Sequence, residues 1–148
     1  MVVVDTSVLS PILKIGKISL LKEFFSKIII TKEVEKEIKT GKIGSGEFEE
    51  ACKTWIQIKE KNSEEIEKLA KLEDIEKADA SIILLAGDNK DILLSNDYAL
   101  ITAAKTKNIE CWWLTTFIIK CVKKKTIKKK EAKQILSDLI KSGMRLKN

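Results

Sequence analysis

The chain opens with MVVVDTSVLS, residues 1–10, which sets a β-branched run directly before a helical pattern. The valines at 2–4 are typical of a buried strand. Residues 5–7 are Asp, Thr and Ser, which are residue types that cap helices. Apolar side chains then recur at helical spacing as far as residue 13. This stretch therefore predicts a strand followed at once by a helix.

The same alternation of strand and helix continues along the chain. Aliphatic and β-branched runs predict further strands at residues 28–30, 91–94 and 109–114. Capping residues and apolar periodicity predict helices at residues 19–26, 32–39, 78–86 and 98–107, with Gly41 ending the second of them and a helical remainder beyond residue 114. Residues 55–58 fit either a short strand or a buried turn of helix, and the sequence leaves both open.

Strands separated by helices need crossover connections, which make the strands parallel and place helices on both faces of the sheet. We therefore expect a three-layer α/β/α sandwich with a central, mainly parallel sheet. Because no linker or repeat interrupts residues 1–148, we expect a single domain with a lysine-rich helical C-terminal part from about residue 115. In such sheets ligands bind outside the carboxyl ends of the strands.

Composition narrows the chemistry available at that edge. The 148 residues include no histidine, which excludes Ser-His and Cys-His nucleophile pairs, mixed His-Cys zinc sites and an imidazole base. The three cysteines form no C-x-x-C motif, so we expect them to be reduced and mostly buried. The apolar stretch at residues 2–4 is shorter than a signal peptide requires, so we expect none, and no apolar run is long enough to span a bilayer. These features predict a cytoplasmic protein without a membrane-spanning segment.

Charge is unevenly distributed along the chain. Residues 120–148 carry eleven basic and two acidic side chains, a net charge of +9, whereas the whole chain carries +6. Such a field attracts polyanions to one end of a protein. The candidate phosphate contacts are the lysines in the densest part of this segment, namely Lys123, Lys124, Lys125, Lys128, Lys129 and Lys130. An ordinary solvated helix face explains the same pattern equally well.

Four acidic residues are expected at the ligand edge of the sheet. They follow strands or lie early in the helices after them, and they are Asp5, Glu37, Asp79 and Asp97. Carboxylates gathered without a counter-charge repel one another, so the cluster implies a divalent cation, and all-oxygen ligation favours Mg²⁺ or Mn²⁺. Taken singly, the three aspartates are also explained as helix caps or turn residues, and the glutamate as a solvated side chain.

Four motifs in order carry a resemblance to a known family: VVVDTSVL at 2–9, ITKEVEKEI at 30–38, ADASIILLA at 78–86 and LLSNDYAL at 93–100. The chain resembles the PIN-domain nucleases, among them the VapC-like toxins of toxin-antitoxin pairs and related archaeal proteins. The resemblance runs from residue 2 to about residue 146. It implies a PIN-like fold and a Mg²⁺- or Mn²⁺-dependent endoribonuclease whose catalytic metal ligands are the four acids named above.

The resemblance also implies supporting residues and partners. Ser7 is expected to orient Asp5, and Ser95 keeps a hydroxyl where the family usually has threonine. RNA is the implied substrate, and a small antitoxin protein and a second copy of the chain are the implied protein partners. The apolar residues at 135, 136, 139 and 140 form either part of the core or a dimer interface.

Two of the acidic positions have competitors. Glu33 shares a helix face with Glu37 at a spacing of four residues. Glu37 is preferred because family members place this acid directly before an aliphatic residue. Asp74 and Glu76 compete more weakly with Asp79.

With no histidine in the chain, hydrolysis of a phosphodiester requires a water activated by a metal. Lysines then serve as clamps for phosphates. Two other functions fit the sequence: a catalytically inactive PIN-like module that binds RNA or protein, and a nucleotide-binding or receiver-like α/β protein, although a Gly-rich phosphate loop is missing. Trp112 and Trp113 are candidates for stacking on a base, but packing in the core is the commoner role of such a pair.

Overall fold

Runs of valine and isoleucine form the central sheet. The computed structural model describes residues 1–143, within which five strands pair in the order β3-β2-β1-β4-β5. The strands are β1 (Val2–Val4), β2 (Ile28–Thr31), β3 (Ile56–Lys59), β4 (Ile92–Leu94) and β5 (Cys111–Trp112). Every neighbouring pair in this sheet is parallel. The expected mainly parallel sheet is therefore confirmed.

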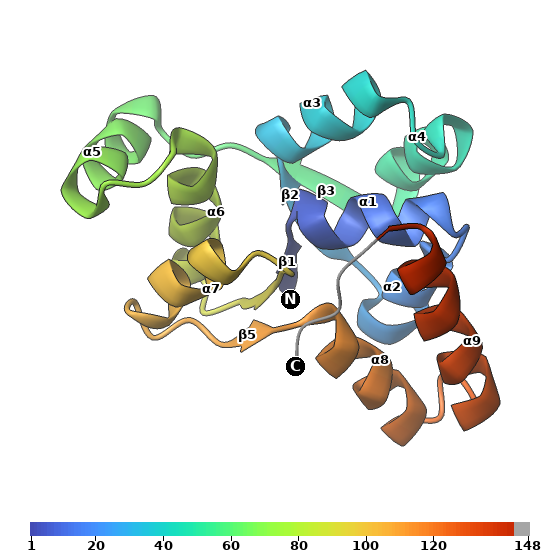
Figure 1. Ribbon diagram of the computed structural model, residues 1–148. Helices are drawn as coiled ribbons and strands as arrows, with labels where there is room; N and C mark the ends of the chain where they lie inside the picture. Colours follow the sequence, from blue (N-terminus) through green and yellow to red (C-terminus); the bar gives the residue numbers. More distant parts are fainter. Residues whose placement is uncertain (144–148) are drawn as a thin grey trace.

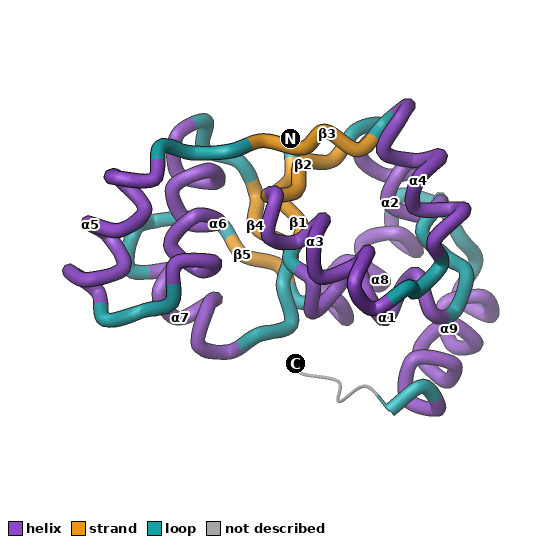
Figure 2. Tube along the Cα trace, turned by 90° about the horizontal axis from the view of Figure 1, so that it is seen from above, coloured by secondary structure: helices purple, strands orange, loops and turns teal. Residues whose placement is uncertain are grey.

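Helices cover both faces of the sheet. Those in the described residues are α1 (Thr6–Lys14), α2 (Ser19–Phe25), α3 (Lys32–Gly41), α4 (Ser45–Thr54), α5 (Ser63–Glu73), α6 (Lys77–Asp88), α7 (Tyr98–Lys105), α8 (Leu114–Lys123) and α9 (Lys129–Lys141). Figures 1 and 2 show α5, α6 and α7 on one side of the sheet and the remaining helices on the other. This is the three-layer α/β/α sandwich that the sequence predicts.

The register of the central strand positions the ligand edge. In β1, Val3 lies opposite Ile29 of β2, and Val4 lies opposite Leu94 of β4. All three residues of β1 are fully buried, because helices on both faces exclude water from a continuous apolar run. Since β1 and β4 end side by side, the residues that follow them, Asp5 and Ser95, emerge together at the carboxyl edge.

Several boundaries differ from the expected ones, and each has a local cause. Residues 55–58, for which the sequence allowed either a strand or a turn of helix, lie mostly in a strand, β3 (Ile56–Lys59), which pairs with β2. The last strand is shorter than the expected 109–114, because Trp113 is already the N-cap of α8 and Leu114 is its first buried residue. Helix α3 continues through Gly41 and ends where Lys42 adopts a left-handed conformation with φ of 53°.

The C-terminal apolar residues mostly enter the core. Ile135 and Leu139 are buried and Leu136 is half-buried, whereas Ile140 is 57% exposed. The stripe on α9 therefore packs against the rest of the molecule and leaves one large apolar side chain outside.

The cysteines are less buried than expected. All three are free thiols, but only Cys121 is fully buried, whereas Cys52 and Cys111 are half-buried. Burial raises the pKa of the Cys121 thiol to about 12, which keeps it protonated and unreactive. In the part of the chain that the structure describes, no helix combines the length and apolar character needed to cross a membrane.

Candidate active site

The ends of β1 and β4 bring Asp5 and Ser95 into contact. The backbone N–H of Asp5 donates to the carbonyl of Leu94 at 3.0 Å, and this bond extends the pairing of the two strands by one step. The Ser95 hydroxyl donates to Asp5 Oδ2 at 3.1 Å across 90 residues of sequence. The expectation that residues after separate strands meet at one edge is confirmed for this pair.

Ser7 completes a network around the Asp5 carboxylate. Its hydroxyl donates to Asp5 Oδ2 at 2.6 Å and accepts from the backbone N–H of Asn96 at 2.8 Å. The backbone N–H of Asp97 in turn donates to Ser95 Oγ at 3.0 Å. Asp5 stands at the N-cap position of α1, yet its side chain makes no capping bond. The two serines therefore hold a buried carboxylate in one orientation, and this carboxylate does not cap the helix.

Asp97 has a structural role in addition to its place at this edge. It is the N-cap of α7, and its Oδ1 accepts from the backbone N–H of Leu100 at 3.2 Å. The sequence offered a turn residue as the ordinary role of Asp97, whereas the structure shows that one of its two carboxylate oxygens caps a helix. Its side chain is exposed and lines the same cavity as Asp5, so the other oxygen is available to a ligand.

Asp79 is the most perturbed carboxylate at this edge. It lies in the first turn of α6, whose N-cap is Glu76, and within residues 1–143 it has no hydrogen bond or ion pair. Its pKa is raised to about 6, first by burial and then by the negative charges of Asp97, Asp5, Glu76 and Glu37, in that order. A half-buried acid surrounded by acids and lacking a partner is an arrangement found more often at functional sites than elsewhere.

The acid on α3 stays ambiguous in the structure. Thr31 caps this helix by accepting from the backbone N–H of Val34 at 3.2 Å, which fixes the direction of its first turns. Both Glu33 and Glu37 are exposed and both line the cavity. The geometry does not choose between them. The structure does distinguish the two competitors of Asp79. Glu76 lines the cavity, whereas Asp74 lies outside it, at the left-handed C-cap of α5.

All four expected acids line one cavity of about 280 Å³ at the carboxyl edge of the sheet. Among the described residues its carboxylates are Asp5, Glu33, Glu37, Glu76, Asp79 and Asp97, and no lysine or arginine lines it. Thr6 also lines it, and the Thr6 hydroxyl is a buried polar atom without a hydrogen-bond partner in residues 1–143. Carboxylate and hydroxyl oxygens in this number fit a hard divalent cation.

The acids are near one another but do not yet form a coordination sphere. Within residues 1–143, no three His, Cys, Asp or Glu side chains are arranged to hold one ion. Asp5 is fixed by its two serines and Asp97 by its capping bond to Leu100, whereas the cavity-lining acids on α3 are exposed and make no such bond in the described residues. The residues therefore fit a cation by their chemistry, and the exposed acids have to turn inward to bind it.

The lysines proposed as phosphate clamps lie elsewhere. They occupy the end of α8, the turn after it and the start of α9, and all six are exposed. Both views place α8 and α9 at the opposite side of the molecule from α6 (Figures 1 and 2). Lys124 is engaged within the chain, because its ammonium lies 4.4 Å from the centre of the Phe24 ring and donates to the Phe24 carbonyl at 3.0 Å. Arg145 and Lys147 lie outside the described residues.

Trp112 is part of the hydrophobic packing. Its ring lies 5.9 Å from those of Phe24 and Phe25, and the ammonium of Lys120 covers it at 4.6 Å. Its indole N–H donates to Glu110 at 2.7 Å. A ring enclosed in this way favours packing over stacking on a nucleic-acid base.

Comparisons with known proteins agree with this fold. The sequence profile of one family, DUF3368, described as a PIN domain, matches residues 1–148. A solved structure of PAE2754 from Pyrobaculum aerophilum is similar with a TM-score of 0.63 and 16% identity, covering 81% of this chain and 93% of that one. A PilT N-terminus domain protein, SSO1118, from Sulfolobus solfataricus P2 is similar with a TM-score of 0.57 and 14% identity, covering 80% and 91%. No curated protein matches the sequence.

Proposed function

The chain belongs to the PIN-domain family, whose members are in general nucleases, and we propose that it is a metal-dependent endoribonuclease that hydrolyses phosphodiester bonds in RNA. One observation carries the proposal: acids from four separate segments line one cavity, where burial and then the repulsion of the other acids raise the pKa of Asp79 to about 6. A fold tolerates such an arrangement at a cost in stability, which a bound cation removes.

Asp5, Asp79, Asp97 and Glu37 are the residues proposed to hold Mg²⁺ or Mn²⁺. When bound, the cation supplies positive charge to the phosphate oxygens and lowers the pKa of the attacking water. Asp5 enters the site already oriented, since two serine hydroxyls donate to its Oδ2. Asp97 contributes the oxygen that does not cap α7.

Asp79 is the acid whose protonation state the site controls. Its raised pKa means that Asp79 retains a proton more readily than an exposed aspartate does. Cation binding requires the ionised form, so the affinity for Mn²⁺ is expected to fall as the pH is lowered through about 6. The chain has no histidine, which leaves carboxylates as its only side-chain bases near neutral pH.

The lysines at 123–130 are proposed to attract RNA from a distance. They form an exposed basic surface at the far side of the molecule from α6, and long-range attraction of this kind steers a polyanion without contacting the reacting bond. We also propose that the chain acts as a toxin neutralised by a small antitoxin protein, and that it forms a homodimer. Ile119 of α8 and Ile140 of α9, which are 54% and 57% exposed, are the candidate apolar contacts for such a partner.

A second function is favoured by one observation. Because no three acids in residues 1–143 are arranged to hold an ion, a catalytically inactive PIN-like module that binds RNA or protein is the main alternative. The two functions differ in their response to metal.

The test is cleavage of an end-labelled, unstructured RNA by the purified chain in Mn²⁺ and in excess chelator. A nuclease is expected to produce internal cuts in Mn²⁺ or Mg²⁺ and none in chelator. RNA that stays intact under all these conditions, with binding retained, would establish the inactive module instead. Cleavage that persists in chelator would contradict the assignment of the acids as metal ligands.

A further inference from the structure

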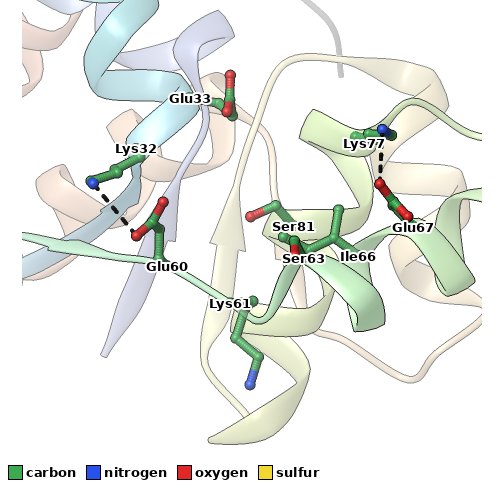
Figure 3. Close-up of a pocket in the computed structure, with 9 residues that line it drawn as sticks. All are labelled: Lys32, Glu33, Glu60, Lys61, Ser63, Ile66, Glu67, Lys77 and Ser81. Carbon is green, nitrogen blue, oxygen red and sulfur yellow. Dashed lines mark hydrogen bonds and ion pairs between the residues drawn. The ribbon is translucent and has the colours of Figure 1, made fainter.

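A second polar cavity adjoins the acidic one. It has a volume of about 230 Å³ and lies between the start of α3, the β3–α5 connection and the facing sides of α5 and α6 (Figure 3). Glu33 lines both cavities, so the two meet along the first turn of α3. Lys32, Lys61 and Lys77 line the second cavity, in contrast to the acidic one, which no lysine in the described residues lines.

A hydroxyl on a largely buried residue faces this cavity and has no hydrogen-bond partner in the described residues. Ser81 of α6 is 5% exposed, and none of the described residues hydrogen-bonds to it. Figure 3 shows its hydroxyl directed toward the part of the cavity where Glu60 lies. Ser81 lines the cavity, so its hydroxyl is available to hydrogen-bond a polar group of a ligand placed there.

Two lysines at the rim hold weak and exchangeable ion pairs. Lys32 contacts Glu60 at 3.5 Å and Lys77 contacts Glu67 at 3.3 Å, and all four side chains are more than half exposed. Exposed ion pairs of this kind contribute little to stability. Both ammonium groups are therefore free to exchange a carboxylate for a phosphate, with the displaced glutamates turning into solvent.

An RNA strand that enters the acidic cavity needs cationic groups close to that cavity. Six carboxylates line that cavity among residues 1–143, and they repel the phosphates on either side of a bond placed there. The basic surface at 123–130 lies across the molecule from α6 and is far from those phosphates. Lys61 is engaged in an ion pair with Asp88, which leaves Lys32 and Lys77 as the lysines of the second cavity that are able to bind a phosphate.

We propose that the second cavity holds a backbone phosphate of single-stranded RNA next to the bond that is cut in the acidic cavity. Lys32 and Lys77 bind the phosphate oxygens, and the Ser81 hydroxyl donates to the same nucleotide. This inference rests on the proposed function, since it places the RNA strand across two adjoining cavities.

The experiment measures binding of fluorescein-labelled oligouridylate in chelator, where no cleavage occurs, by anisotropy at several salt concentrations. The test variant is Lys32→Gln with Lys77→Gln. The matched control is Lys36→Gln with Lys68→Gln, because these exposed lysines lie on α3 and α5 but line neither cavity. Both double variants remove the same charge. Thermal melts confirm that each variant is folded.

The test pair is expected to weaken binding and to reduce the slope of log K against log salt by about 0.7 for each lysine, and the control pair to change neither by a comparable amount. Ser81→Ala is expected to weaken binding about fivefold, the value of one net hydrogen bond, without lowering the melting temperature. Equal losses in the two double variants, or no binding by the unaltered chain, would overturn the proposal.

Failure of this inference is distinguishable from failure of the nuclease. If the unaltered chain cleaves RNA in Mn²⁺ but Lys32 and Lys77 do not affect binding, the second cavity is not a phosphate site and the nuclease stands. If binding depends on these lysines while no cleavage occurs in Mn²⁺, the phosphate site stands and the nuclease is rejected.

Discussion

At the scale of single residues, Asp79 differs most from an ordinary surface acid. It is half-buried, no hydrogen bond or ion pair within the described residues compensates its charge, and four other carboxylates raise its pKa in addition to burial. Asp97, by contrast, has a hydrogen-bond partner, because one of its oxygens caps α7. The same substitution is therefore expected to have different effects on stability at the two positions.

Asp79→Asn and Asp97→Asn are each expected to abolish RNA cleavage in Mn²⁺ while the fold is retained. Asparagine keeps the shape of aspartate but supplies no charge to hold a cation. Without metal, Asp79→Asn should raise the melting temperature by relieving repulsion. Asp97→Asn should raise it less, because this change relieves the repulsion but leaves the Asp79 charge half-buried, and asparagine caps a helix about as well as aspartate. Single-turnover cleavage and thermal melts measure both effects.

The control for these variants is Asp138→Asn on α9. Its Oδ1 accepts from Gln134 at 2.9 Å, an interaction that asparagine preserves, and it does not line the acidic cavity. It should change neither cleavage nor stability. Full activity in both Asp79→Asn and Asp97→Asn would show that the cleavage site lies elsewhere.

The raised pKa of Asp79 predicts a pH-dependent difference between the unaltered chain and Asp79→Asn in chelator. The folded-state pKa of about 6 exceeds the value of 3.8 for the free side chain, so the folded chain binds this proton more tightly than the unfolded chain. The destabilisation is therefore absent below about pH 3.8, grows as the pH rises, and is complete above about pH 6. Melting temperatures should be similar at pH 4 and favour the variant at pH 7.5. A constant difference across this range would contradict the shift.

At the scale of elements, α8 and α9 form a basic unit attached through aromatic packing. Phe117 of α8 is fully buried and lies 5.5 Å from Phe24 and 5.6 Å from Phe25 of α2. Lys124 adds a cation over the Phe24 ring at the end of α8. This packing joins the lysine-rich C-terminal part to the layer of helices on one side of the sheet.

Changing Lys123, Lys125 and Lys129 to glutamine is expected to weaken RNA binding in chelator without altering stability. Within the described residues their side chains have no hydrogen bond or ion pair, in contrast to Lys124. The salt slope should fall by at most about 0.7 for each phosphate that the variant no longer binds. Binding titrations at several salt concentrations measure it.

The matched control changes Lys14, Lys36 and Lys53 to glutamine. These exposed side chains lie on α1, α3 and α4 and line neither cavity. If both triple variants lose the same affinity, net charge alone explains binding, and the turn between α8 and α9 has no special part in it.

At the scale of the whole molecule, the acidic cavity joins segments that are distant in sequence. Its acids come from the end of β1, from α3, from α6 and from the start of α7. A cation bound to all of them requires the complete fold, because the unfolded chain does not bring these residues together. Metal binding and folding are therefore expected to be linked.

Mn²⁺ is accordingly expected to raise the melting temperature of the unaltered chain. A ligand that binds only the folded state adds about 2.7 kcal/mol to the free energy of unfolding at a hundredfold excess over Kd. The same addition should have little effect on Asp79→Asn, which lacks one proposed ligand. Melting curves in Mn²⁺ and in chelator that coincide for the unaltered chain would argue against a metal site.

Much of this architecture follows from the sequence alone. Continuous apolar runs such as residues 2–4 indicate strands buried on both faces, and their separation by amphipathic helices permits only a parallel, three-layer arrangement. That arrangement sends the residues after each strand to one edge, so the sequence predicts Asp5 and Asp97 at the same edge, and it adds Asp79 because this acid opens a buried helix. These features depend on local pattern and on the limited handedness of crossover connections.

Other features depended on contacts between distant residues. Trp112 is an aromatic residue after a strand in sequence, and only its packing on Phe24 and Phe25 favours a structural role. The shared face of Glu33 and Glu37 was visible in their spacing, but their equal access to the cavity was not. Glu76 lines the cavity and Asp74 does not, because Glu76 is the N-cap of α6 whereas Asp74 is the C-cap of α5.

For Ser81 and for the basic surface, too, the sequence showed the residue types and the tertiary structure decided their positions. In the sequence Ser81 is one polar residue in a buried helix, and only the approach of α3 and the β3–α5 connection makes its hydroxyl face a cavity lined by lysines. The charge of residues 123–130 was evident from composition, whereas its position across the molecule from α6 was decided by where α8 packs. Local sequence thus determined the elements and their chemistry. Their distances were decided by tertiary packing, since the contacts that position one element belong to residues on others.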